Sequence, residues 1–319
     1  MHVVKYDSLK LTGLMKGSVR VEDLIIEPYQ PKRDKNSIRA TLCGDEQIKE
    51  LLRCERMFPD GIFVARYNGI TVGFLSIDGI KRKAQTMIYV SEEYRRKGIG
   101  TALMAKVDHL LTPHKIVERS MGGCMDGDRS TLQFLYKNGY YISWSSHIME
   151  REGGYLPEQH ISVRPYEDDD YETCHVLIEV AFYKLHDNLG MLPTYYFPPN
   201  ENERKRMFDN KSNIYVLLVE GEIAGVGHID GNELSHVSVR HDLQSQGYGR
   251  PFVSFLVNEI MRRGNTIVQL GVVKGNYARK LYESLGFNEK SLYHWLTKYY
   301  RPDTRMSRPP SEILSVESR

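Results

Sequence analysis

The sequence predicts an α/β protein that contains two copies of one unit, and three observations lead to this prediction. First, the residues from Val90 to Gly100 and from Val239 to Gly249 share one spacing, with seven residues between the valine and the first glycine. Second, Gly69 and Gly73 recur 152 residues later, at positions 221 and 225. Third, strand-like and helix-like segments follow one another in the same order in both halves. These patterns indicate an internal duplication of a β-α-β-β-β-arm-α-β-α-β unit, in which the arm is a polar stretch between strand and helix.

The first copy is expected to begin with a short apolar strand and to continue through a helix and a hairpin. Asp45 is a suitable N-cap for a helix with apolar residues at helical spacing. Asn68-Gly69 joins two β-rich runs, which is a strong hairpin signal. The expected elements are a strand at 24–28, a basic loop at 32–35, a helix at 45–57, a hairpin at 62–77, a strand ending at 90, a helix after 100, a strand opening at 116–117, a helix at 131–137 and a strand at 140–148.

The second copy repeats this order after a turn-rich break at residues 151–159. A strand at 161–165 ends in proline, as the first one does, and a helix is expected from Asp170 to Lys184. A second hairpin spans 214–229 and turns at Glu220-Gly221. We therefore expect domains at 1–153 and 154–300, followed by a polar extension at 301–319.

Length and composition limit the class of protein. A chain of 319 residues is long enough for two domains, and its 26% charged and 41% hydrophobic residues are typical of globular proteins. A net charge of +2 does not favour binding to nucleic acid or to an anionic membrane, and no apolar run approaches the ~18 residues of a membrane span. The N-terminus lacks the apolar core of a signal peptide. The four cysteines have no metal-site spacing, so we expect a cytoplasmic protein without a metal site.

Each of the two repeated loops places glycines at the start of a helix, where unpaired N–H groups favour a phosphate. A Rossmann fingerprint does not fit, because Leu103 and Phe252 stand where the third glycine is needed. A Walker loop does not fit either, because neither Gly100 nor Gly249 is followed by Lys-Ser or Lys-Thr. Two ordinary helix starts remain the alternative, but they would leave the shared spacing to chance.

Both loops resemble the Gln/Arg-x-x-Gly-x-Gly/Ala motif of the GCN5-related N-acetyltransferases, as Arg95 to Gly100 and as Gln244 to Gly249. The order of elements is similar over roughly residues 22–150 and 160–300, and the tandem arrangement is similar to that of mycothiol synthase. The resemblance implies two domains with mixed, mostly antiparallel sheets flanked by helices, each with a central parallel pair of strands that splay apart. It also implies that the backbone amides of the arm hold the pyrophosphate of acetyl-CoA.

The resemblance assigns acetyl-CoA binding to the strand before each arm, the arm itself and the first turn of the next helix. In the second half these positions are Val237, Val239, Gln244, Ser245, Gln246, Gly247, Tyr248, Gly249, Arg250 and Asn276, and in the first half Val90, Arg95, Arg96, Lys97, Gly98, Ile99, Gly100 and Thr101.

Acyl transfer from a thioester to an amine needs a base for the amine proton, an acid for the departing thiolate and a donor for the carbonyl oxygen. Tyr282 lies four residues before Gly286, where the family carries the tyrosine acid; a core aromatic residue is the alternative. Glu233 lies where family members often carry a catalytic carboxylate, and His236 is the second candidate base. A regular strand points these two side chains to opposite faces, and a β-bulge would change that parity. A backbone N–H between Val237 and Val239 would stabilise the oxyanion.

The first half lacks both catalytic positions. Ala84 stands where a carboxylate is expected, and Leu135 stands where the tyrosine is expected, with Tyr136 out of phase by one residue. Its arm is nevertheless the more basic one, through Arg95-Arg96-Lys97. We therefore expect a first domain that binds the cofactor or is purely structural.

The loop from Asn188 to Glu203 carries three consecutive aromatic residues, and it lies where the family usually builds its acceptor pocket. Packing within the protein explains those aromatic residues equally well. The expected function is transfer of an acetyl group from acetyl-CoA to a primary amine, most simply a small molecule, by the second domain of a monomer or homodimer. A non-catalytic acyl-CoA sensor or assembly module is the alternative.

Overall fold

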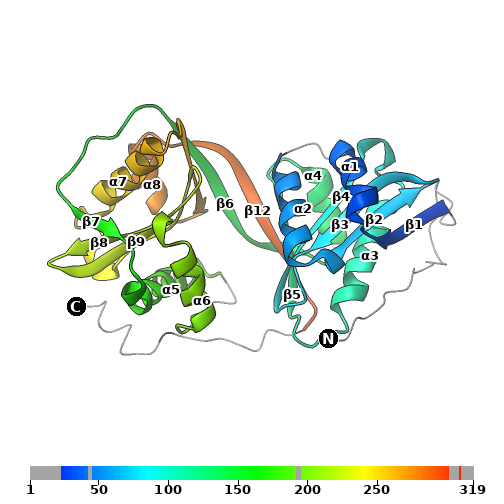
Figure 1. The fold of residues 1–319 in the computed structure, drawn as a ribbon, viewed down its shortest axis with the longest axis horizontal. Helices are drawn as coiled ribbons and strands as arrows, with labels where there is room; N and C mark the ends of the chain where they lie inside the picture. The colour runs from blue at the N-terminus through cyan, green and yellow to red at the C-terminus, as the bar shows by residue number, and fades with distance from the viewer. Residues whose placement is uncertain (1–22, 42–44, 192–194, 302–308, 310–319) are drawn as a thin grey trace. The chain divides into compact units, whose positions relative to one another are not determined.

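The computed structural model describes residues 23–41, 45–191, 195–301 and 309. Residues 1–22 lie outside this set, as does almost all of the expected extension at 301–319. The chain forms two compact units (Figure 1). Unit 1 contains residues up to Gly123, Arg129–Tyr141 and Leu296–Pro302, and unit 2 contains Cys124–Asp128 and Ile142–Trp295.

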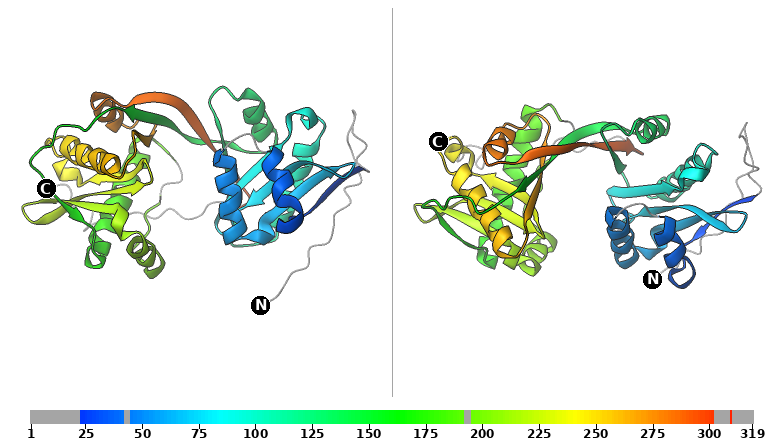
Figure 2. Two further views of the ribbon diagram at one scale, coloured as in Figure 1. Left: turned by 45° about the horizontal axis from the view of Figure 1, so that its top comes forward. Right: turned by 90° about the horizontal axis from the view of Figure 1, so that it is seen from above.

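Unit 1 contains one sheet with helices on both of its faces. Its elements are β1 (Leu24–Pro28), α1 (Pro31–Thr41), α2 (Asp45–Met57), β2 (Ile62–Tyr67), β3 (Ile70–Ile77), β4 (Lys83–Val90), α3 (Ile99–Leu111), β5 (Arg119–Met125) and α4 (Arg129–Lys137). The strand order is β1-β2-β3-β4-β5, and the C-terminal end of β12 (Asn288–Tyr299) follows β5. Helices α1 and α2 lie on one side of this sheet, and α3 and α4 lie on the other (Figure 2).

Unit 2 repeats the arrangement. Its elements are β6 (Tyr141–Glu152), β7 (Ser162–Pro165), α5 (Tyr171–Asn188), α6 (Glu201–Asp209), β8 (Ile214–Val219), β9 (Glu222–Asp230), β10 (Glu233–Val239), α7 (Gly249–Arg262), β11 (Ile267–Val273), α8 (Ala278–Ser284) and the start of β12. The strand order from β12 is β6-β11-β10-β9-β8-β7. Strands β4 and β5 pair in parallel, as do β10 and β11, whereas the neighbouring pairs are antiparallel. The predicted fold class is confirmed.

Both predicted hairpins are present, and they turn at the predicted residues. Asn68 and Gly69 have φ values of 49° and 77°, and Glu220 and Gly221 have 53° and 85°. Two consecutive residues at positive φ are what a type I′ turn requires, and its twist matches that of the flanking strands. The duplication read from the sequence is therefore a duplication of backbone conformation.

Two local predictions in unit 1 were wrong. Residues 32–35, expected as a basic loop, form the first turn of α1, because Pro31 occupies its first position and Asp34 accepts the Gln30 N–H at 2.8 Å. The strand expected to open at 116–117 begins at Arg119 instead.

Asp34 is fully buried and is held by two guanidinium groups. It forms ion pairs with Arg33 at 2.6 Å and with Arg66. Burial alone would raise the pKa of Asp34, but hydrogen bonds from the Arg33 side chain and the Gln30 amide hold it below its usual value. The charged carboxylate therefore fastens the start of α1 to β2.

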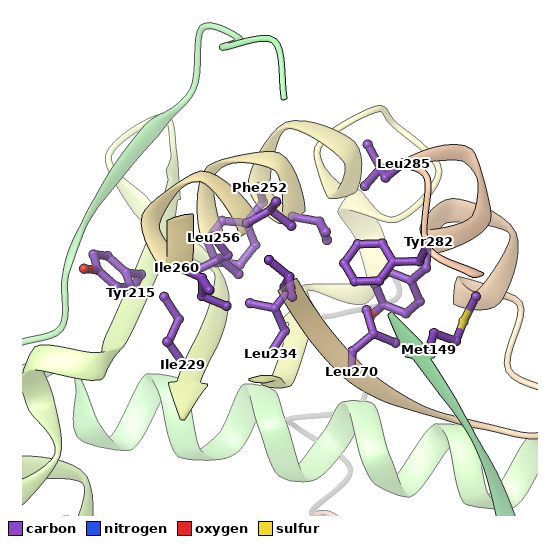
Figure 3. Close-up of a cluster of buried hydrophobic side chains, with 14 of the residues drawn as sticks. Met149, Tyr215, Ile229, Leu234, Phe252, Leu256, Ile260, Leu270, Tyr282 and Leu285 are labelled. Atoms are coloured by element: carbon purple, nitrogen blue, oxygen red, sulfur yellow. The ribbon is translucent and has the colours of Figure 1, made fainter. Parts of the chain in front are cut away.

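The larger core of unit 2 lies between the sheet and helices α7 and α8. Phe252, Leu256 and Ile260 of α7 point towards Ile229 and Leu234 of the sheet (Figure 3). A second cluster packs α5 and α6 against β8 and β9. The catalytic candidates of β10 therefore lie on a strand that helices cover on both faces. None of the described helices is long and apolar enough to cross a membrane.

The boundary between units is drawn differently by the sequence and by the structure. The turn-rich break at 151–159 follows β6, but β6 itself pairs with β11 from Ser146 to Glu152, inside unit 2. Apart from Cys124–Asp128, the described residues of unit 2 run without interruption from Ile142 to Trp295, and the chain returns to unit 1 at Leu296. Unit 1 therefore completes its sheet with residues that are distant in the sequence from its other strands.

Candidate functional site

Each unit contains a candidate site of its own, built around an arm: residues 91–98 in unit 1 (arm 1) and residues 240–247 in unit 2 (arm 2). Each arm starts with a single 3₁₀ turn, at Glu92–Tyr94 and at His241–Leu243. Arg96 and Ser245 follow with φ values of 63° and 62°. Gly98 and Gly247 have φ values of 87° and 96°. Two arms with different side chains therefore share one backbone conformation, which selects glycine at the second left-handed position.

The first side chain of each motif holds its arm against the preceding strand. Arg95 Nε donates to the Val90 carbonyl at 3.0 Å, and Gln244 Nε2 donates to the Val239 carbonyl at 2.9 Å. The Tyr277 hydroxyl in turn donates to Gln244 Oε1. The Gln/Arg choice in the motif thus has a structural reason, because both side chains carry an N–H that reaches the same carbonyl.

Each arm leads into a helix, and the first backbone N–H groups of that helix come before the first N–H that donates to a carbonyl one turn earlier. The first helical hydrogen bonds run from the Ala102 amide to the Gly98 carbonyl and from the Phe252 amide to the Tyr248 carbonyl. The amides before them are available to an anion, and the helix dipole adds partial positive charge. A Cβ on Gly249 would stand 3.3 Å from Leu281, so this glycine also lets α7 pack closely on α8.

The structure collects the predicted acetyl-CoA positions around these two arms. Those of unit 2 lie on the last half of β10 (Val237, Val239), in arm 2 and the next residue (Gln244, Ser245, Gln246, Gly247, Tyr248), at the start of α7 (Gly249, Arg250) and before α8 (Asn276). Those of unit 1 lie at the end of β4 (Val90), in arm 1 (Arg95, Arg96, Lys97, Gly98) and in the first turn of α3 (Ile99, Gly100, Thr101). Asn276 Oδ1 accepts the Ala278 N–H at 2.9 Å, which leaves its side-chain N–H₂ group as the donor for a ligand.

The parallel strands of each unit splay apart. Strands β10 and β11 pair at Glu233 and Leu234, and β10 then continues to Val239 without further pairing to β11. Strands β4 and β5 pair from Lys83 to Gln85, and β4 continues to Val90. The arms therefore follow directly from strand ends that no longer pair on the side of their parallel neighbour.

A β-bulge distinguishes unit 2 from unit 1. In the pairing of β10 with β9, Ser235 lies opposite His228, and the next paired residue of β10 is Ser238, opposite Val226. His236 and Val237 therefore stand outside the ladder. His236 has a φ of 49°, which is uncommon for a residue with a side chain. The corresponding register between β4 and β3 is unbroken from Thr86 to Val90. The bulge frees backbone N–H groups in the splayed part of unit 2.

The bulge also decides where His236 points. Leu234 belongs to the core beneath α7, so strand alternation turns Glu233 to the opposite face. The His236 ring lies 5.7 Å from Phe182 of α5 and 5.1 Å from His228 of β9, on that same opposite face. Glu233 and His236 therefore share a face, as the sequence analysis allowed for a bulged strand.

Glu233 and His236 differ in their surroundings. Glu233 is an exposed residue at the first position of β10, where that strand is still paired to β11. The His236 ring is open to solvent on one side, while the surrounding protein lowers its pKa by desolvation; Arg206 adds to the decrease and Glu203 opposes it. His236 is therefore mostly neutral at pH 7 and able to accept a proton.

Tyr282 is a buried residue at the end of the core beneath α7 (Figure 3). Its ring packs edge-on against Phe287, with centroids 5.9 Å apart. Burial raises the pKa of Tyr282 to about 12, and the neighbouring Tyr277 contributes to the rise. The hydroxyl thus stays protonated over the whole physiological range and can donate a hydrogen bond.

Unit 1 lacks these side chains in the structure as well as in the sequence. Ala84 is buried in β4, Leu135 is buried on α4, and Tyr136 is 46% exposed. Lys97 lies over the Tyr94 ring at 5.0 Å, and Arg95 lies over the Tyr89 ring at 5.9 Å. The basic side chains of arm 1 are thus held along its surface by aromatic rings.

The aromatic loop predicted for the acceptor is fastened to α5. The Phe197 N–H donates to Glu179 Oε2 at 3.0 Å, and His175 Nε2 lies 2.8 Å from the Phe197 carbonyl. Tyr196 is buried, whereas Phe197 is 44% exposed. Residues 192–194 of this loop lie outside the described residues. Phe197 of the loop is therefore held against α5, and α5 in turn packs on β10.

Two family models, both described as an acetyltransferase (GNAT) domain, match residues 59–142 and residues 193–292. Together the two matches include more than half of the chain, one in each half. The chain belongs to the GNAT acetyltransferase family. The resemblance noted in the two loop motifs is thereby confirmed, with one GNAT domain in each half of the protein.

Relatives of this GNAT protein are similar over part of the chain. A ribosomal protein bS18-alanine N-acetyltransferase from Haemophilus ducreyi is 32% identical over 89 residues, which are 28% of this chain and 59% of that protein. The same enzyme from Escherichia coli K12 is 40% identical over 65 residues, which are 20% of this chain and 44% of that protein. The chain thus spans about half the length of these relatives.

Solved structures share the fold over nearly the whole GNAT protein. A GCN5-related N-acetyltransferase from Sphaerobacter thermophilus has a TM-score of 0.70 at 18% identity and covers 90% of this chain and 99% of that chain. A tandem GNAT protein from the clavulanic acid biosynthesis pathway has a TM-score of 0.60 at 14% identity, and the match covers 88% of this chain and 99% of that chain. At these identities the likeness is one of fold.

Sequence reasoning missed two residues of the site, Phe182 and His228. Phe182 lies in the predicted helix and His228 in the predicted hairpin, where each has the pattern of an ordinary structural residue. The histidine pair in the neighbouring strands β9 and β10 was the available signal, but only the bulge brings the two rings together.

Proposed function

We propose that this GNAT protein transfers an acetyl group from acetyl-CoA to a primary amine, and that unit 2 is the catalytic unit. The observation that carries the proposal is the bulge in β10, which β4 lacks. It provides unpaired N–H groups and a neutral imidazole in the splayed part of the strand, next to an arm with the family motif.

Arm 2 supports the binding half of this proposal. The left-handed conformation of Gly247 and the unpaired amides of Gly249 and Arg250 provide N–H donors for a pyrophosphate. Pro251 has no N–H, so the donors end there. When bound, acetyl-CoA supplies the activated acyl group as a thioester.

His236 is the better supported base in this mechanism. It would take the proton that the amine loses on attack, and its lowered pKa keeps it neutral for that role. Glu233, the first candidate from the sequence, stands before the strands part, and β-strand geometry separates it from Val237 by roughly 13 Å. The N–H of Val237 would stabilise negative charge on the carbonyl oxygen.

Tyr282 would assist departure of the thiol. With a pKa of about 12, its hydroxyl is a weaker acid than a thiol, whose pKa is near 8.5. Complete proton transfer to a free thiolate is therefore uphill, and the main contribution of Tyr282 is a hydrogen bond to the sulfur as charge develops on it. Such a contribution acts on the chemical step and not on substrate binding.

Unit 1 would bind CoA without turnover. Its arm has the same backbone conformation and more positive charge, but its strand β4 is regular and carries no histidine, and α4 has Leu135 where unit 2 has Tyr282. A role as a cofactor-binding or structural unit follows from this combination.

The experiment that tests the proposal measures release of free thiol from acetyl-CoA in the presence of primary amines. The panel contains small amines and peptides with a free N-terminus, the latter because the relatives are named for an alanine of a ribosomal protein. We expect acceptor-dependent thiol release that is lost in His236→Gln. Binding of CoA without thiol release for any amine would favour the sensor or assembly module instead.

A further inference from the structure

A bridge of two side chains joins arm 2 to the loop that follows β11. The Tyr277 hydroxyl donates to Gln244 Oε1, and Gln244 Nε2 donates to the Val239 carbonyl at 2.9 Å. Because the second bond uses the amide N–H, the amide oxygen of Gln244 is the atom that faces Tyr277, and it can only accept. The end of β10 and the residues after β11 are therefore connected through these two side chains.

The Tyr277–Gln244 bridge lies at the open end of the splayed strand pair. Strands β10 and β11 pair at Glu233 and Leu234 and then part, whereas Gln244 and Tyr277 come after the ends of these two strands. The splayed part is thus closed by backbone pairing at one end and by side chains at the other. Tyr277 also contributes to the raised pKa of Tyr282, so the bridge lies within electrostatic range of the residue proposed to assist the thiol.

Tyr277 is the movable half of the bridge. The loop backbone is held by the Asn276 N–H, which donates to the Val273 carbonyl at 2.9 Å, and the Gln244 side chain is held by Val239. Tyr277 itself is 64% exposed. Exposed side chains change rotamer rapidly, so the Tyr277 ring can swing into solvent once its hydrogen bond breaks.

The side chains of this bridge are not repeated in unit 1. Tyr277 stands nine residues before Gly286, and Ser130 stands nine residues before Gly139. The first position of the arm 1 motif is Arg95, whose guanidinium group has N–H donors and no acceptor for a hydroxyl. Since both arms share one backbone conformation, the bridge distinguishes the proposed catalytic unit by its side chains alone.

We propose that the Tyr277–Gln244 bridge is a gate for acetyl-CoA in unit 2, which opens and closes through the Tyr277 side chain. This inference rests on the proposed binding of acetyl-CoA by arm 2 and the splayed part of β10. A cofactor with its pyrophosphate on arm 2 and its acyl end beside Val237 runs through the space that the bridge crosses. The hydrogen bond has to break when the cofactor enters and again when it leaves, so the bridge slows both steps.

Surface plasmon resonance with CoA and the immobilised full-length protein measures the rates of both steps. In Tyr277→Phe, which removes the hydroxyl and keeps the ring, the association and dissociation rate constants should both rise about 2- to 13-fold. This range corresponds to the net contribution of one hydrogen bond, about 0.5–1.5 kcal/mol. The Kd for CoA should stay nearly unchanged, because the two rate constants rise together.

Two further variants separate a gate from a structural contact. Tyr277→Ser, which places the residue of unit 1 at this position, should raise both rate constants at least as much as Tyr277→Phe. Tyr136→Phe is the matched control, because it removes the hydroxyl of an exposed tyrosine of unit 1, and it should change neither rate constant. Unchanged rate constants in Tyr277→Phe, or a raised Kd at an unchanged association rate constant, overturn the gate while the proposed function stands. If the natural protein binds no CoA, the proposed function fails and the gate fails with it.

Discussion

Gly247→Ala tests which arm serves catalysis, and its cost can be worked out from the backbone. Gly247 has a φ of 96°, and a Cβ added there would meet no atom within 4 Å. The cost is therefore conformational and not steric, about 1–2 kcal/mol for an L-residue in the left-handed region. If this strain falls on the ligand-binding conformation of arm 2, the KM for acetyl-CoA should rise about 5- to 30-fold. The kcat value should change less, because the reacting groups are untouched.

Gly98→Ala is the matched control, because Gly98 has a φ of 87° at the same place in arm 1. It applies the same backbone strain to unit 1, so its effect on thermal unfolding should be similar. Initial rates are measured over a range of acetyl-CoA concentrations, with thermal unfolding of both variants alongside. The reasoning is refuted if Gly98→Ala raises KM while Gly247→Ala does not, since unit 1 would then be the catalytic unit.

Three other predictions follow from single side chains. Tyr282→Phe should lower kcat by about 10²-fold or more at unchanged KM for acetyl-CoA, and unchanged kcat in steady-state assays would remove Tyr282 from the mechanism. Because the pKa of His236 is lowered, kcat/KM should fall only as the pH drops through a value below 6.5. In a pH–rate profile, His236→Gln should abolish this decrease at low pH, and Glu233→Gln should keep it. Asp34→Asn should destabilise unit 1 by about 3–5 kcal/mol in urea unfolding at pH 7. Since the pKa of Asp34 is lowered in the folded state, this stabilisation is present above pH 3.8 and is lost as the pH falls through the folded value below it.

Local sequence signals predicted most of the fold correctly, because they act over a few residues. Asn68-Gly69 favours a type I′ turn wherever it joins two strands, and the spacing of Gly98 and Gly247 reflects a left-handed position that every copy of the arm needs. The helix α1 was missed although Pro31 and Asp34 are signals for its start. There, the basic run at 32–35 predicts a loop, whereas pairing with Arg66, more than thirty residues away, buries the Asp34 carboxylate at the start of the helix.

The sequence by itself determined that this protein is a tandem repeat, that both copies carry an arm suited to phosphate, and that Tyr282 is present in one copy only. Only the tertiary structure decided which residues meet beside the splayed part of β10. A bulge of one residue in β10 reverses the face to which His236 points and brings its ring next to His228 and Phe182. A single extra residue in a strand ladder has no sequence pattern of its own, so the sequence does not reveal it. Likewise, only long-range strand pairing shows that the sheet of unit 1 is completed by the distant end of β12, since hydrogen bonds between backbones do not depend on the side chains that a sequence displays.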